Sequence, residues 1–95
     1  MNRIEFYKNN RKVDIIPEEI IYFKEDMKIQ KETEEMIIIL DFKNNRCQLI
    51  TKPDNIRLEI PVISMNSNIS GNEDTYEYVL ETQPDIKNKI IIYEI

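Results

Sequence analysis

The apolar residues of this sequence occur in short runs in which apolar and polar side chains alternate, and polar turn residues separate the runs. Residues 56–60 and 76–81 both follow this pattern. A period of two residues places the apolar side chains of a strand on one face of a sheet, whereas a helix requires a period near 3.6. The pattern therefore predicts an all-β, mostly antiparallel fold, a small barrel or sandwich of about seven or eight strands.

Composition supports this prediction. Isoleucine, which is stiff at χ1 and packs well on a pleated surface, supplies about a fifth of the chain, and alanine, the best helix former, is absent. Hydrophobic residues are 41% and charged residues 33% of the 95 residues, which is globular composition. We expect residues 1–95 to form a single domain.

Residues 17–36 are ambiguous between one helix and several strands. Pro17 followed by two glutamates resembles a helix start, and Ile20, Phe23 and Met27 fit a helical stripe. The stripe ends after two turns, whereas strands would bury more of the apolar residues that follow, beginning with Met27 and Ile29. We therefore favour strands and keep one helix within 17–36 as the alternative.

The letters KNNR occur twice, at residues 8–11 and 43–46. Because asparagine tolerates positive φ, each copy predicts a two-residue hairpin loop at its paired asparagines. In the second copy this register opposes Phe42 to Cys47. The apolar positions differ by one residue between the copies, which sends them to opposite faces of the sheet. We predict one kind of turn used twice, without a structural repeat.

Turn residues also divide the second half of the chain. The composition of residues 66–74 predicts a loop, and that of residues 83–89 predicts a turn before a final strand at 90–95. Pro61 cannot donate to a ladder and marks an edge or bend before a short strand at 62–65. An unpaired edge there would permit dimerisation by strand addition, although Pro61 argues against a long open edge.

The residue inventory disfavours most catalytic and metal chemistry. Histidine is absent, Cys47 is the only cysteine and Gly71 the only glycine. Zinc sites, Cys–His nucleophile pairs and phosphate-cradling loops need more of these residues. We therefore expect no enzyme activity, no metal and no cofactor. The lone cysteine, with neither a signal peptide nor a membrane-length apolar run, predicts a cytoplasmic protein.

Two acidic clusters and the tyrosines near the second cluster are the candidate binding residues. The net charge of −5 disfavours direct binding to nucleic acid, whose phosphates require Lys and Arg. Carboxylates in a row can imitate phosphates and occupy a basic groove, although they also serve simple solubility. Tyrosine is enriched at protein interfaces. The predicted partner-binding residues are Glu25, Asp26, Glu32, Glu34, Glu35, Glu73, Asp74, Glu77, Glu81, Tyr76 and Tyr78.

These features predict a non-catalytic protein–protein interaction module. A narrower expectation is an acidic inhibitor that mimics nucleic acid and binds a basic nucleic-acid-binding protein. The chain is similar in size and charge to small acidic inhibitors encoded by phages and mobile elements, although no motif identifies a family. The alternative is a lipocalin-like β-barrel that binds a small apolar ligand.

Overall fold

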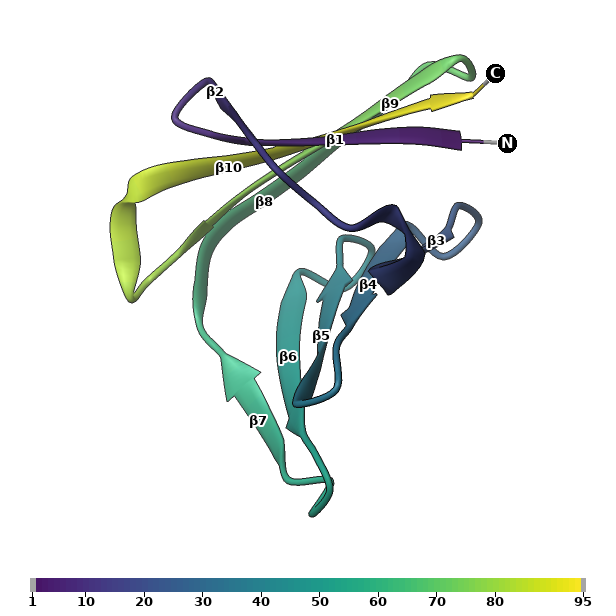
Figure 1. Cartoon of the computed structure of the whole chain (residues 1–95). Coiled ribbons are helices and arrows are strands. Elements are labelled where there is room, and N and C mark those ends of the chain that lie inside the picture. Colours follow the sequence, from purple (N-terminus) through teal and green to yellow (C-terminus); the bar gives the residue numbers. More distant parts are fainter. Residues whose placement is uncertain (1, 95) are drawn as a thin grey trace. The chain divides into compact units, whose positions relative to one another are not determined.

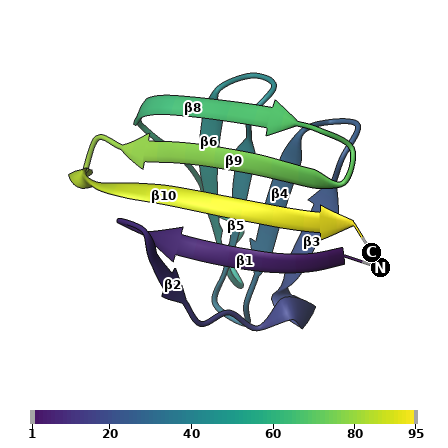
Figure 2. The same ribbon diagram turned by 90° about the horizontal axis from the view of Figure 1, so that it is seen from above.

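The computed structural model describes residues 2–94 and is all-β, with two antiparallel sheets of five strands each (Figures 1 and 2). The prediction of an all-β, mostly antiparallel fold is confirmed. Residues 2–94 contain ten strands, more than the seven or eight expected. The strands are β1 (Asn2–Lys8), β2 (Arg11–Val13), β3 (Ile20–Phe23), β4 (Lys28–Glu32), β5 (Met36–Asp41), β6 (Arg46–Thr51), β7 (Arg57–Ile60), β8 (Val62–Ile69), β9 (Glu73–Leu80) and β10 (Gln83–Glu94).

Two segments far apart in the sequence form the first compact unit, which comprises residues 2–15 and 63–94. Its strand order is β2-β1-β10-β9-β8, so the first strand of the chain pairs with the last (Figure 2). On one face of this sheet Phe6 lies opposite Ile90, and Ile90 lies opposite Tyr76. Ile90, Tyr76 and the nearby Ile92 are almost completely buried and form the core of the unit.

The first KNNR hairpin has the predicted loop. Asn9 and Asn10 both have positive φ, 50° and 65°, and Lys8 lies opposite Arg11. Asn9 also contacts a strand outside its hairpin. Its side-chain oxygen accepts a hydrogen bond from the backbone N–H of Lys87 at 2.9 Å, and its own N–H donates to the Lys87 carbonyl at 2.9 Å. This asparagine therefore joins the β1–β2 turn to β10.

The predicted turn at residues 83–89 is wrong, because these residues belong to β10. The chain reverses at Glu81 and Thr82, and Leu80 lies opposite Gln83. A register irregularity between Gln83 and Asn88 accommodates the extra residues within the strand. Proline is tolerated at such a bulge, and the two hydrogen bonds between Asn9 and Lys87 hold the irregular backbone in place.

The predicted loop at residues 66–74 is also mostly strand. β8 continues to Ile69 and β9 begins at Glu73, which leaves only residues 70–72 between them. Ile63, Met65 and Ile69 keep a period of two residues through this polar sequence. Pairing with β9 supplies the backbone hydrogen bonds that overcome the weak strand propensity of the asparagines and serines.

The second compact unit, residues 16–62, is a meander in which each strand pairs with the next, in the order β3-β4-β5-β6-β7. The preference for strands within 17–36 is confirmed. The helix start at Pro17 yields only one 3₁₀ turn, Pro17–Glu19, and β3 begins at the next residue. Ile29, Leu40 and Cys47 lie side by side on three strands and are buried.

The second KNNR hairpin differs from the prediction. Asp41, and not Lys43, lies opposite Arg46, so the loop has four residues and Leu40 faces Cys47. Of the two asparagines only Asn45 has positive φ. The Asp41 carboxylate accepts hydrogen bonds from the Asn44 backbone N–H at 3.1 Å and from its side chain at 2.9 Å. An aspartate before the loop thus selects a different turn for the same four letters.

Candidate functional site: the acidic turn between β4 and β5

The structure separates the predicted acidic residues into distinct places. Glu25 and Asp26 are exposed in the β3–β4 turn, at one end of β4. At the other end of β4, Glu32 closes the strand, and Glu34 and Glu35 are exposed in the β4–β5 turn. The first acidic cluster is therefore divided between the two ends of one strand.

The second cluster is divided by the alternation of β9. Glu73 and Glu77 lie on one face with exposed side chains, and Glu81 is exposed in the following turn. The opposite face carries Asp74, Tyr76 and Tyr78.

Burial then decides which residues of that second face can be reached. Asp74 and Tyr76 have no exposed surface, and Tyr78 is half-buried. Asp74 and Tyr76 therefore belong to the core of their unit and present no binding surface.

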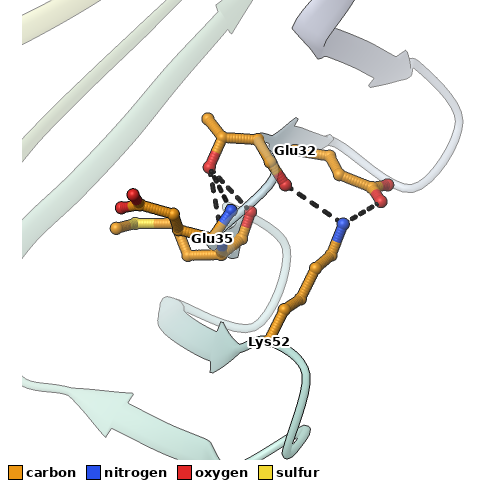
Figure 3. Close-up of polar contacts among 5 residues, drawn as sticks. Glu32, Glu35 and Lys52 are labelled. Carbon is orange, nitrogen blue, oxygen red and sulfur yellow. Dashed lines mark hydrogen bonds and ion pairs between the residues drawn. The ribbon is translucent and has the colours of Figure 1, made fainter.

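The β4–β5 turn is held by one threonine (Figure 3). The Thr33 hydroxyl oxygen accepts hydrogen bonds from the backbone N–H groups of Glu35 at 3.3 Å and Met36 at 3.2 Å. The Thr33 backbone N–H donates to the Met36 carbonyl at 2.9 Å. This arrangement closes the turn locally and leaves the side chains of Glu34 and Glu35 exposed.

Lys52, in the loop after β6, contacts the β4–β5 turn and holds it in place (Figure 3). The Lys52 ammonium lies 2.5 Å from a carboxylate oxygen of Glu32 and donates to the Thr33 carbonyl at 3.1 Å. Its backbone N–H donates to the Glu35 carbonyl at 2.9 Å. Three contacts from one residue thus tie the turn to the neighbouring loop.

The contacts of Lys52 divide the three glutamates into two kinds. All three side chains are exposed, but the charge of Glu32 is balanced by Lys52, whereas no contact joins the Lys52 ammonium to the carboxylates of Glu34 and Glu35. A half-open hollow of about 370 Å³ lies beside them, lined by Lys31, Thr33, Glu34, Glu35, Met36 and Ile38. The hollow combines apolar walls with charged side chains of both signs.

Sequence reasoning found the glutamates of this site but missed the residues that position them. The Thr33 hydroxyl binds N–H groups two and three residues later in the sequence. This spacing is typical of a turn closed by a threonine hydroxyl, so the role of Thr33 could have been predicted from the neighbouring sequence. Lys52 lies 20 residues beyond Glu32, and no local pattern connects them.

A second polar cluster lies on β1, β2 and β10. Glu5 accepts a hydrogen bond from the Tyr7 hydroxyl at 2.9 Å and lies 3.1 Å from the Lys12 ammonium. These contacts hold the pKa of Glu5 below its ordinary value, and the same carboxylate raises the pKa of Tyr7. The Arg3 guanidinium lies 4.3 Å from the ring centre of Tyr93. Glu5, Tyr7 and Lys12 therefore pair with one another, and Arg3 lies against an aromatic ring.

Two further findings concern residues 2–94 as a whole. In this part of the chain no group of three or more His, Cys, Asp or Glu side chains is placed to hold a metal ion. In the same residues no helix has the length and apolar character needed to cross a membrane.

Comparison with protein-family models, curated proteins and solved structures found no match to this chain.

Proposed function

We propose that this protein is a non-catalytic protein–protein interaction module that binds a basic partner through the β4–β5 turn. The observation that supports the proposal is the pair of exposed carboxylates, Glu34 and Glu35, on a turn whose backbone is fixed by Thr33 and Lys52. A partner that binds a turn already held in one conformation does not have to order it, which reduces the free-energy cost of association.

The narrower proposal is that the partner is a nucleic-acid-binding protein and that the carboxylates take the place of phosphates. Adjacent negative charges, together with the net charge of −5, favour encounter with a positively charged groove. Tight binding of this kind uses arginine, whose planar guanidinium matches a carboxylate as well as a phosphate. The function would then be inhibition by occupation of the nucleic-acid site.

The structure also sharpens the choice of residues to mutate. Charge reversal at Glu32 would place a cation against Lys52 and disturb the turn itself, which would mix stability with binding. Reversal of Glu34 and Glu35 removes the exposed charges and leaves the Lys52 contacts in place. A lysine pair at these two positions is therefore the informative variant.

The proposal is tested by affinity capture from a lysate of the source cells, treated with nuclease and analysed by mass spectrometry. We expect capture of a basic nucleic-acid-binding protein, and Glu34→Lys/Glu35→Lys to weaken its binding about tenfold or more, because like charges then meet. The control is Glu18→Lys/Asp54→Lys, two exposed acids elsewhere in the same unit. Both variants change the net charge equally, since each replaces two negative charges by two positive ones.

Equal binding by the two variants would contradict a role for this turn. Any loss of partner binding would then follow from the change in net charge. The small-ligand alternative predicts a different result. A lipocalin-like protein would bind an apolar fluorescent probe, and the bound probe would raise the melting temperature of the protein. Neither charge variant would change that binding.

A further inference from the structure

The outer strand of the first unit, β8, has unusual properties for the edge of a sheet. It is eight residues long, and among residues 2–94 it has β9 on one side and no strand on the other (Figure 2). Ile63 and Ile69 are 56% and 42% exposed, and residues 66–70 are all exposed. Its outer backbone groups are therefore available to another strand.

β8 also lacks the residues that normally protect an edge. Proteins blunt exposed strands with charged side chains, prolines or bulges. Here residues 60–72 carry no charge, in a chain in which 33% of residues are charged, and β8 contains no proline. The other outer strands are less suited to pairing, because β2 has three residues and β3 and β7 have four each.

We propose that β8 pairs with β8 of a second copy of this chain, antiparallel and centred on Asn66. A two-fold axis perpendicular to the sheet keeps each face of the sheet on its own side, so opposed residues must come from the same face of β8. Centring on Asn66 meets this condition and opposes Ile63 to Ile69 of the partner subunit, and Met65 to Ser67 of the partner subunit. The sheet that contains β8 would join the same sheet of the second copy, which gives one sheet of ten strands.

The sequence of β8 is self-complementary in this register. The segment ISMNSNI reads similarly in both directions, with isoleucine at each end, serine and asparagine next to the ends, and Asn66 at the centre. The exposed isoleucines would cover one another at both ends, and no like charges would meet, although each chain has a net charge of −5. Pairing through one strand buries a small area, so we expect a weak, concentration-dependent dimer.

The experiment is sedimentation equilibrium of the full chain up to about 1 mM, where weak complexes associate. The wild type should approach twice the 11.5 kDa chain mass. Because Asn66 faces itself across the axis, Asn66→Lys and Asn66→Glu should each weaken dimerisation about tenfold or more. An equimolar mixture of the two variants should restore the dimer, since opposite charges then meet.

The control is Asn72→Lys, which adds the same charge in the β8–β9 turn, beyond the strand, and should dimerise like the wild type. Circular dichroism shows whether each variant keeps the fold, and Asn66 is exposed, so the substitutions remove no packing. A wild type that stays monomeric would overturn the proposal. So would a dimer that Asn66→Lys leaves unchanged, or variants whose mixture does not reassociate.

Discussion

Asparagine occupies four of the five non-glycine positions with positive φ in residues 2–94, because its short polar side chain tolerates the left-handed region. The asparagines of the two KNNR sequences do not have equal roles. Asn9 and Asn10 share a backbone conformation, but Asn9 also holds the backbone of Lys87. Asn44 has no positive φ and instead donates hydrogen bonds to Asp41.

The first hairpin therefore gives a matched pair of substitutions. Glycine adopts positive φ freely, so Asn10→Gly should change the free energy of unfolding by less than about 0.5 kcal/mol. Asn9→Gly keeps the backbone conformation but removes the acceptor for Lys87, and should cost about 1 kcal/mol. Urea denaturation measures both values. A large loss for Asn10→Gly would contradict the two-residue loop, and equal values would contradict the role of the Asn9 side chain.

At the scale of elements, two turns of this protein are each set by a single side chain that binds the backbone. Asp41 fixes the β5–β6 loop and Thr33 fixes the β4–β5 turn. The Thr33 hydroxyl oxygen accepts from two backbone N–H groups, and the two Asp41 carboxylate oxygens accept from the backbone and the side chain of Asn44. The proposed binding surface therefore depends on Thr33 as much as on the glutamates it positions.

Removal of the Thr33 hydroxyl tests this dependence. Thr33→Val keeps the shape of the side chain but leaves the N–H groups of Glu35 and Met36 without their acceptor, and should destabilise the protein by about 1–2 kcal/mol. Thr33→Ser keeps the hydroxyl and should lose less than about 0.5 kcal/mol. If the turn is the binding surface, Thr33→Val should also weaken capture of the partner although Glu34 and Glu35 remain. Wild-type stability in Thr33→Val would contradict the role of the hydroxyl.

At the scale of the whole molecule, the absence of histidine removes the side chain that ordinarily titrates near neutrality. Among residues 2–94, three carboxyl groups have a lowered pKa. Tyr7 and Lys12 lower that of Glu5, and Arg46 and Gln48 lower that of Glu59. Partial burial opposes the charge on Asp41, but the hydrogen bonds from Asn44 prevail and its pKa is also lowered. Burial, with the nearby Glu59 charge, raises the pKa of the Cys47 thiol to about 11.

These shifts predict the dependence of stability on pH. A carboxyl group with a lowered pKa stabilises the fold above its unfolded pKa, and this contribution is lost as pH falls through the folded pKa. Stability should therefore be flat from about pH 6 to 8 and fall below about pH 4.5.

The thiol acts in the opposite direction. Its stabilisation is present below its unfolded pKa and is lost as pH rises through the raised folded value. The urea midpoint measured against pH tests both limbs. A clear change between pH 6 and 8 would contradict this account, and Cys47→Ser should remove part of the alkaline loss.

Local sequence patterns predicted part of the fold and part of the candidate site. The period-two alternation and the absence of alanine indicated an all-β protein. Strands at 20–32 were predicted because the helical stripe of apolar residues ends after two turns. Paired asparagines also determined the first hairpin. Glu32, Glu34 and Glu35 were identified from charge alone. In each case the signal lies within a few neighbouring residues, which is the range over which backbone preference and periodicity act.

Tertiary structure decided what depends on residues distant in sequence. The two KNNR loops differ through a local contact, since Asp41 binds Asn44 three residues away. The strands at 66–69 and 83–89 depend on distant partners, because β8 pairs with β9, and residues 83–89 of β10 pair with β9 and with the end of β1. Burial separated Asp74 and Tyr76 from the exposed carboxylates, and Lys52 distinguished Glu32 from Glu34 and Glu35. The physical reason is that a hydrogen bond, a buried surface or an ion pair requires a partner, and here the chain brings that partner from a distant strand or loop.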